Sequence, residues 1–556
     1  MTATDSRRWW ALGALSLSVL VVALDLFVLT LALPTVSADL HASSGDLQWF
    51  VDAYSLVLAA ALLPAGLLGD RLGRKRLLLG ALAAFGAASL ACAYSVSAGQ
   101  LIAARAVLGL AAAVILPMSL AVLPILFTAS ERPKAIAAVG GATFLGYPIG
   151  PILGGWLLDH FWWGSVFLIN VPVVIIAIVA VALLMPESRG DHKPRIDVAG
   201  IVLSSAGLTS LTYGLIKAGD NGWTDRTAVL TMLAGAVGLA VFAGWERQVA
   251  RRPGQTAGEE ALPLVDLGLF GSAGFTWGTV LSTLVSFALF GLVFAMPQYF
   301  LDVRGFNSLG AGLRMLPLIG GLALGLIVGQ RLQTPPRPRR SKAGALEAGT
   351  PIAAPEPRVG VKILVATGFV IMAAALAIGT RTTVGSGTGF AAAWFAAAGF
   401  GLGMAMPTAL NAAIGALSPA RSGSGSALIT ATRQVGGTIG VAVLGTVMAT
   451  VYRSHLHLGA LPATAQHVIR DSVAGGIAAA RATGSRVLLE AVRGGYVHGL
   501  DVMLWVCSGI AVGSAVLALM FLPNHGGASP DDESGSIPGD TGTSATSALD
   551  KSTITT

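Results

Sequence analysis

Long apolar runs recur from the N-terminal tryptophan pair to Pro523, and they constrain this chain more than any other feature. A hydrocarbon core about 30 Å thick needs about 20 apolar residues per helix, and the runs reach that length. Only 11% of the 556 residues are charged, against about 25% in soluble proteins, so the chain cannot cover itself with water-facing side chains. The sequence therefore predicts an all-α integral membrane protein with about 14 transmembrane helices.

Hydropathy places the predicted spans along the whole chain. They are 10–33, 47–68, 77–96, 100–127, 136–158, 165–185, 198–219, 226–245, 273–297, 309–331, 361–380, 387–411, 426–450 and 499–522. The first run is about 22 residues long, which exceeds the apolar region of a signal peptide, and further spans follow it. We therefore expect an uncleaved first helix.

Basic residues gather in the loops that follow the even-numbered spans. Examples are Arg71, Arg74, Lys75 and Arg76 after the second span, Arg132 and Lys134 after the fourth, and Arg337, Arg339, Arg340 and Lys342 after the tenth. Because Lys and Arg near span ends stay in the cytoplasm, both termini are expected to be cytoplasmic, in a multi-pass protein of the plasma membrane. The same clusters explain the net charge of +7 without nucleic acid as a partner.

The predicted domains follow from these spans and from the segments between them. They are an N-terminal six-helix bundle (1–197), two inserted helices with a cytoplasmic linker (198–272), a C-terminal six-helix bundle (273–522) and a disordered cytoplasmic tail (523–556). Within the C-terminal bundle we expect a cytoplasmic linker at 332–360 and an outer loop at 451–498, where residues 474–492 have the spacing of a helical hairpin.

Several kinds of chemistry are absent from the sequence. Its two cysteines, Cys92 and Cys507, lie in apolar runs, and its eight histidines fall outside the predicted spans, so we expect neither a disulfide framework nor a metal site. No P-loop motif provides a cradle for ATP. We therefore expect no enzyme activity and no cofactor, and any pumping must draw on an ion gradient or on a separate subunit. We also expect a monomer in the lipid bilayer.

The most specific string in the chain lies between the second and third spans, at residues 66–76. Glycines there allow a sharp turn, Asp70 can pair with a basic neighbour or cap a helix, and the cations hold the loop inside. An ordinary positive-inside loop would explain the charges but not their order. The string resembles the signature Gly-x-Leu-Ala-Asp-Arg-x-Gly-Arg-Lys of the major facilitator superfamily, with Gly69 in place of Ala.

This resemblance implies a fold of two six-helix bundles plus two inserted helices. It also implies a role in gating on the cytoplasmic side, which we assign to Gly66, Asp70, Arg71, Gly73, Arg74 and Lys75.

The fifth predicted span is rich in glycine and proline. Glycines four residues apart let helices approach closely, and prolines bend a span, so generic tight packing is one explanation. The span also resembles the antiporter motif of the superfamily, in which Gly is followed after eight residues by Gly-Pro-x-x-Gly-Gly. The residues concerned are Gly141, Gly146, Pro148, Gly150, Pro151, Gly154 and Gly155. The motif is associated with exporters, so the resemblance implies the direction of transport.

The first span contains a carboxylate, Asp25, that would lie in the hydrocarbon. A charge there costs about 2.5–3.5 kcal/mol on insertion scales, which makes it a functional candidate. At about 1.5 Å per residue, Asp25 lies about 12 Å from the outer end of its span, and both Arg105 and Asp52 about 8 Å from theirs. We therefore expect Asp25, Arg105 and Asp52 to meet in the outer half of one bundle. Asp25 and Arg105 are the candidates to couple proton movement, with a static ion pair as the alternative.

The surroundings of Asp25 resemble the signature Leu-Asp-x-Thr-x-x-Asn-x-Ala-Leu-Pro of 14-span drug:proton antiporters, with Phe27 and Thr30 in place of Thr and Asn. Arg105 begins a string, Arg-Ala-Val-Leu-Gly109, that is similar to the span-four motif of the superfamily.

Substrate-binding candidates cluster in the second span, at Trp49, Asp52 and Tyr54. An acid with aromatic neighbours suits an organic cation, and the stretch looks like exporters of quaternary ammonium compounds. Trp49 as an interfacial residue and Asp52 as a hydrated one remain alternatives. The second half instead offers Arg314 and Arg433, which could bind neutral or anionic substrates or could pair structurally.

Together these features predict a proton-coupled antiporter that exports lipophilic drugs, antibiotics or organic cations by alternating access, as in multidrug efflux and antibiotic resistance. Two other functions remain open at this point: an importer of a small solute with the same fold, and a membrane sensor that transports nothing.

Overall fold

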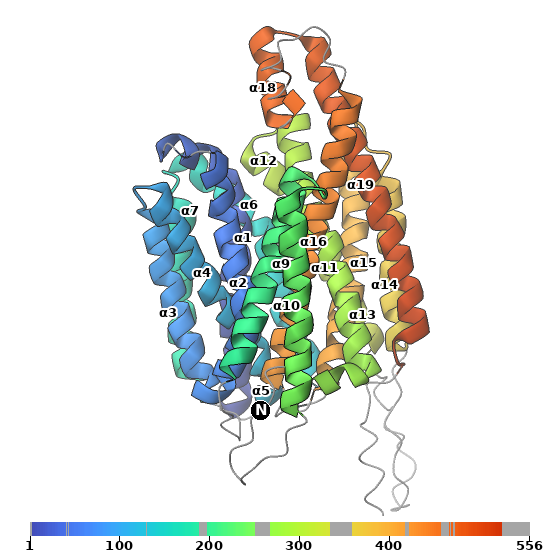
Figure 1. Ribbon diagram of the computed structural model, residues 1–556. Helices are drawn as coiled ribbons and strands as arrows, with labels where there is room; N and C mark the ends of the chain where they lie inside the picture. The colour runs from blue at the N-terminus through green and yellow to red at the C-terminus, as the bar shows by residue number, and fades with distance from the viewer. Residues whose placement is uncertain are drawn as a thin grey trace, which may run out of the picture.

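The computed structural model describes residues 3–40, 42, 44–128, 131–187, 197–250, 267–333, 359–417, 422–456, 466, 469–470 and 473–524. Every regular element within these ranges is helical (Figure 1). The all-α fold predicted from the apolar runs is therefore confirmed for the described part of the chain.

Eight helices among the described residues, α1 to α8, make up the first half of the structure, which ends before the two inserted helices. They are α1 (Ala3–Asp39), α2 (Ser44–Leu72), α3 (Arg74–Ala93), α4 (Ala98–Ala121), α5 (Leu123–Leu126), α6 (Arg132–His160), α7 (Ser165–Leu168) and α8 (Asn170–Leu184). The long helices α9 (Val198–Asn221) and α10 (Arg226–Ala250) follow.

The second half opens with the short turn η1 (Leu267–Gly271). After it come α11 (Ala273–Gln298), η2 (Tyr299–Val303), α12 (Ser308–Leu313), α13 (Leu316–Gln333), α14 (Val361–Gly379), α15 (Thr388–Gly415), α16 (Ser422–His455), α18 (Val473–Thr483) and α19 (Arg486–Phe521).

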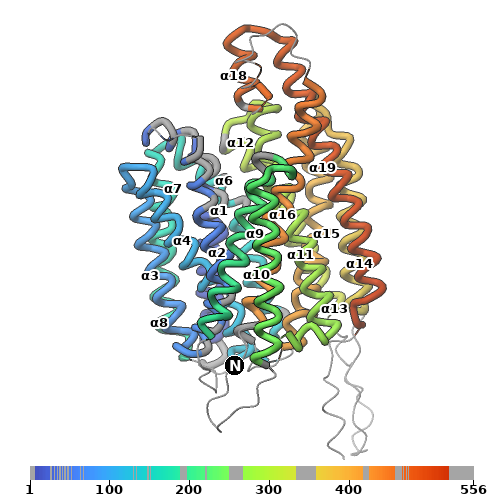
Figure 2. The backbone as a smooth tube through the Cα atoms, viewed as in Figure 1, coloured from blue at the N-terminus to red at the C-terminus, as the bar shows by residue number. Residues whose placement is uncertain are grey.

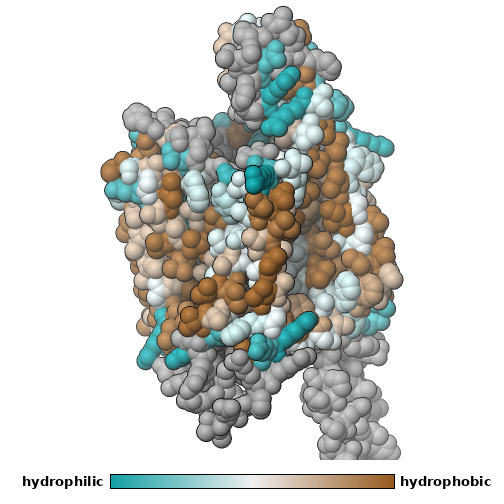
Figure 3. Space-filling view, in the orientation of Figure 1, coloured by the Kyte–Doolittle hydropathy of each residue, from teal (hydrophilic) through white to brown (hydrophobic). Residues whose placement is uncertain are grey.

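Among the described residues, 12 stretches are long and apolar enough to cross a membrane. The helices α2 and α6 lie outside these 12, although each contains 29 residues. The total of 14 crossings therefore stays a prediction. Figure 3 shows apolar side chains over the middle of the visible face and hydrophilic ones towards its two ends, as expected for a bundle immersed in lipid.

The helix α1 begins, and α19 ends, at the same end of the bundle (Figures 1 and 2). We call this the inner end, because it carries the basic loop between α2 and α3, and we call the opposite end, which carries α18, the outer end. The assignment of the inner end to the cytoplasm rests on the distribution of Lys and Arg.

Buried apolar side chains form two clusters. One is built mainly from α1 to α8, and the other mainly from α11 to α19. The inserted helix α9 contacts α2 from the first group and α16 from the second, while α10 packs chiefly on α9 (Figures 1 and 2). The predicted domain boundaries stay predictions, and most of the predicted linkers (251–266, 334–358) and the tail from 525 on lie outside the described residues.

Two helix boundaries differ from those expected from hydropathy. The predicted span 309–331 is divided into α12 and α13, because Pro317 lies in the first turn of α13, where a missing N–H is tolerated. The helix α19 begins well before the predicted residue 499, because Ser485 caps it: its hydroxyl accepts a hydrogen bond from the Leu488 amide at 3.2 Å. Gly484, with φ of 63°, forms the turn between α18 and α19.

Glycines hold α13 and α15 together reciprocally. On α13, a Cβ at Gly321 would overlap the Ala396 carbonyl of α15. On α15, a Cβ at Gly399 would overlap the Leu318 carbonyl of α13. Gly325 and Gly403 repeat the arrangement one turn further along. Small residues of this kind let helix backbones approach where lipid offers no hydrophobic driving force.

The variant Gly321→Ala is therefore expected to destabilise the protein by about 1–3 kcal/mol, the usual cost of overpacking. The neighbouring change Gly320→Ala is the matched control, since a Cβ there meets nothing within 4 Å. Thermal unfolding of the purified protein measures the difference. Equal melting of the two variants would show that the close approach of α13 and α15 is not required.

Candidate functional site

An ion pair buried in the first half of the chain is the centre of the candidate site. The Nη1 atom of Arg105 on α4 donates to Oδ2 of Asp25 on α1 at 2.5 Å. Both side chains are shielded from solvent, at 1% and 0% exposure. Two opposite charges in this setting stabilise each other only because the geometry is close and further hydrogen bonds satisfy them.

Arg105 is held by two further contacts, both with α2. Its Nε atom donates to the Phe50 carbonyl at 2.8 Å, and its guanidinium lies 4.5 Å from the centre of the Tyr54 ring. One turn along α4, a Cβ at Gly109 would overlap the Tyr54 carbonyl. The string from Arg105 to Gly109 thus has a direct structural explanation: the arginine reaches α1, and the glycine lets α4 lie against α2.

Asn170 completes the site, and the sequence reasoning missed it. Its Nδ2 atom donates to Oδ1 of Asp25 at 3.0 Å and lies 3.3 Å from the Ser89 hydroxyl. Its Oδ1 atom is buried and has no hydrogen-bond partner among the described residues. The signal that could have revealed it is a lone amide in the apolar run 165–184.

The glycines of the predicted antiporter motif pack α6 against α1 on either side of Asp25. A Cβ at Gly146 would approach the Leu20 carbonyl at 3.0 Å, one at Gly150 the Leu24 carbonyl at 3.0 Å, and one at Gly154 the Val28 side chain at 2.7 Å. The motif therefore brings two backbones together along the segment of α1 that carries the acid. The side chains of Pro148 and Pro151 lie outside the described residues.

Gly141 and Gly155 complete the motif. A Cβ at Gly141 would meet Leu326 of α13 at 3.7 Å, so this position faces the second half of the chain. Gly155 is buried.

The predicted gating loop ties α2 and α3 to the inner ends of α4 and α8. Gly73, with φ of 102°, makes the turn before α3, a conformation that favours glycine. Arg74 donates to the Ala121 carbonyl at 3.2 Å, and Lys75 donates to the Ala182 carbonyl at 2.7 Å. These contacts fall within the first half, and the gating role stays a prediction.

The remaining loop residues are only partly described. Gly66 is buried and Arg71 is half-buried, while the Asp70 side chain lies outside the described residues. A Cβ at Gly69 would overlap the Met118 sulfur. The Met118 side chain is flexible, so alanine at this position would require only that its end shift.

Two of the predicted substrate residues of α2, Trp49 and Tyr54, have different neighbours. Trp49 is 42% exposed and stacks on Tyr213 of α9, with ring centres 6.4 Å apart. Tyr54 is buried beside Arg105, and the Asp52 side chain lies outside the described residues. Their part in substrate binding stays a prediction.

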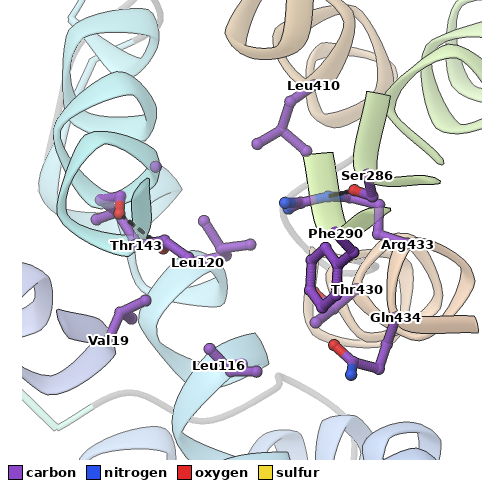
Figure 4. A pocket seen from close by; sticks show the side chains of 12 residues that line it. Val19, Leu116, Leu120, Thr143, Ser286, Phe290, Leu410, Thr430, Arg433 and Gln434 are labelled. Atoms are coloured by element: carbon purple, nitrogen blue, oxygen red, sulfur yellow. Dashed lines mark hydrogen bonds between the residues drawn. The ribbon is translucent and has the colours of Figure 1, made fainter. Parts of the chain in front are cut away.

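A cavity lies between the two halves of the chain (Figure 4). It comprises about 570 Å³ of atom-free space, part of it open to solvent. Its described lining residues are Val19, Leu116, Leu120, Val139, Gly140, Thr143, Ser286, Phe290, Leu410, Thr430, Arg433 and Gln434. Figure 4 shows residues of α1, α4 and α6 facing those of α11 and α16 across it.

The cavity and the ion pair occupy different faces of α1. Val19 lines the cavity, and Ala23, one turn further along, packs into the core of the second half. Asp25 is about 200° around the helix from Ala23, so it points into the first bundle. The ion pair and the cavity are therefore connected by α1 and share no side chain among the described residues.

The two intramembrane arginines of the second half have separate places. Arg433 lines the cavity and donates to the Ser286 hydroxyl at 3.3 Å. Arg314 is not among the described residues of the cavity: it lies 3.4 Å from the centre of the Phe306 ring and donates to the Gly310 carbonyl. In the described part of the chain, no three His, Cys, Asp or Glu side chains are placed to hold a metal ion.

Arg105→Gln is expected to lower the unfolding free energy by about 3–5 kcal/mol, because it leaves the Asp25 carboxylate buried without its counter-charge. The double variant D25N/R105Q should melt closer to the wild type, since no charge then stays buried. Thermal unfolding of both variants in detergent measures this. If R105Q melted like the wild type, the pair would contribute nothing to folding.

Comparison with known proteins identifies the family of this chain. Residues 15–441 match the model of the Major Facilitator Superfamily. The multidrug efflux pump LfrA of Mycolicibacterium smegmatis is 33% identical over 504 residues, which cover 90% of this chain and 93% of LfrA. The methyl viologen resistance protein SmvA of Salmonella typhimurium is 31% identical over 511 residues, covering 90% and 95%.

Among solved structures, the human organic anion transporter MFSD10 has the same fold. Its TM-score is 0.57 at 13% sequence identity, with 93% of this chain and 100% of that chain covered. The resemblance seen in the loop 66–76 and in the glycine motif is thus confirmed: the chain belongs to the major facilitator superfamily.

Proposed function

We propose that this protein is a proton-coupled antiporter that exports lipophilic drugs, antibiotics or related small molecules across the plasma membrane, with both termini in the cytoplasm. The observation that carries the proposal is the buried pair of Asp25 and Arg105, set on one face of α1 while another face of the same helix borders the central cavity. The efflux and resistance proteins that the chain matches over about nine-tenths of its length support export.

The carboxylate of Asp25 is the group proposed to carry the proton. As an anion it accepts hydrogen bonds from Arg105 and from Asn170. Protonation would remove the charge that draws α1 to α4, and so would weaken the hold of α4 on α1. Because Gly146, Gly150 and Gly154 pack α6 directly on the same stretch of α1, a shift of α1 would carry α6 with it and move the wall of the cavity that the first half provides.

Asn170 can serve both protonation states of Asp25. Its NH2 group donates to the carboxylate in the structure. After rotation of the amide by about 180°, the Oδ1 atom, which has no partner among the described residues, could accept from a protonated carboxyl. With an amide at this position, the hydroxyl of the protonated Asp25 carboxyl group would have a hydrogen-bond acceptor. The protonated state would then avoid the free-energy cost of a buried hydroxyl without a partner.

The energy of one proton suffices for such a cycle. A single charge that moves through 100 mV releases about 2.3 kcal/mol, which supports a solute gradient of about 50-fold. The chain contains no ATP-binding P-loop, and the proposal needs none.

Asp25→Asn is expected to abolish transport driven by a proton gradient, because the amide cannot release and take up the proton. Inverted vesicles from an efflux-deficient host, energised acid inside, would be given a panel of lipophilic cations, neutral dyes and anionic antibiotics. The wild type should accumulate at least one of them, and D25N at equal expression should accumulate none.

Asp159→Asn is the matched control, since Asp159 is an exposed residue at the end of α6. It should transport like the wild type. Gradient-driven uptake by D25N at the wild-type rate would contradict the role of Asp25. A wild type that accumulates nothing from the panel would contradict export.

A further inference from the structure

We propose that the inner end of α8 binds the headgroup of an anionic phospholipid, whose acyl chains lie along the exposed side of the same helix. The phosphate is held by Arg7 of α1 and by Lys75 and Arg76 of α3. This inference goes beyond the proposed transport function and does not depend on it, since it concerns the outer surface of the first bundle.

Basic side chains from two helices converge on the last turn of α8. An Nη atom of Arg7 donates to the Leu183 carbonyl at 2.5 Å, and Nζ of Lys75 donates to the Ala182 carbonyl at 2.7 Å. The last turn of a helix leaves carbonyls without internal partners and carries a partial negative charge. The end of α8 therefore fixes one cation from α1 and one from α3 on consecutive carbonyls.

These cations are not neutralised by the helix end. Arg7 is exposed, Lys75 is half-buried, and the Arg76 side chain is 71% exposed. Each side chain carries several N–H donors, and the contacts with α8 use only one donor of Arg7 and one of Lys75. Among the described residues, the carboxylate that pairs with this group is Glu187, at 3.5 Å from Nε of Arg76. The cluster therefore has an excess of positive charge.

An apolar strip on α8 leads to the basic cluster. Ile176, Val179 and Leu183 are 59%, 52% and 64% exposed, and their spacing of three and four residues places them on one face of the helix. The helix packs on α1 and on α3 (Figure 2), and the strip is the side that neither covers. In a bilayer this side meets acyl chains. The strip ends at the residue whose carbonyl accepts from Arg7, so the contacts for chain and headgroup adjoin.

Trp10 adds a contact at the level of the headgroups. It follows Arg7 by one turn of α1 and is 68% exposed, and tryptophan is enriched at the membrane interface. A zwitterionic lipid carries its own cation beside the phosphate, whereas an anionic lipid leaves its charge for the protein to neutralise. Basic clusters between helices on the cytoplasmic side suit anionic headgroups for this reason.

Native mass spectrometry of the purified full-length protein tests this inference. Phosphatidylglycerol and phosphatidylcholine with the same acyl chains would be titrated onto the protein in detergent, to measure the dissociation constant of the first bound lipid. The wild type should bind phosphatidylglycerol more tightly. The double variant R7Q/K75Q should weaken this binding about 30-fold, the effect of two charges near a membrane surface, and should leave phosphatidylcholine unchanged.

The variants are chosen to separate charge from fold. Glutamine at positions 7 and 75 keeps a donor for each α8 carbonyl, so the helix end stays capped. The variant R7K/K75R keeps both cations and should retain the preference for phosphatidylglycerol. Arg247→Gln removes an exposed arginine from the last turn of α10 and should leave both affinities as they were.

Equal affinity of the wild type for the two lipids would overturn the inference. So would unchanged binding of phosphatidylglycerol by R7Q/K75Q, or an equal weakening of both lipids. Glycerol 3-phosphate that bound as tightly as phosphatidylglycerol would also overturn it, because the acyl chains would then contribute nothing. Binding is measured without substrate or gradient, so these outcomes are independent of whether the protein transports.

Discussion

A charged carboxylate cannot remain alone inside a membrane protein, and this constraint organises the first half of the molecule. Asp25 lies fully buried, so Arg105 must reach it from α4 and Asn170 from α8. Glycines bring other helices close around this pair. Those along α6 pack it on α1 beside Asp25, and Gly109 lets α4 lie against α2 one turn from Arg105. The ion pair and the glycine pattern are therefore two parts of one arrangement.

The second principle of the structure is that the proposed proton site and the cavity lie in different places. The acid that we propose to carry the proton is sealed within the first bundle, and the cavity that would hold the cargo has a cation from the second half, Arg433, in its wall. The two sites share α1 rather than a common ligand. In the proposed antiport, exchange of proton for cargo would therefore depend on the movement of a helix, since the proton and the cargo would not compete for the same side chain.

Much of this could be predicted from the sequence. The helical membrane fold follows from the apolar runs, and helix rise alone placed Asp25 and Arg105 at similar depths, where the structure pairs them. Rotation about each helix axis could not be predicted in the same way. Trp49 shares its helix with Tyr54 yet stacks on α9, and Arg433 lines the cavity whereas Arg314 does not. Which face a side chain occupies depends on neighbours far apart in the sequence.

The inserted helix α9 touches α2 of the first half and α16 of the second, and so forms a strut across the joint between them. Any rocking that parts α2 from α16 must therefore shear α9 against at least one of them. The helix α10 packs chiefly on α9, so it would move outward with α9 into the surrounding lipid. The bilayer itself would then resist or assist each turnover, so lateral pressure and acyl-chain length become determinants of how fast the molecule can work.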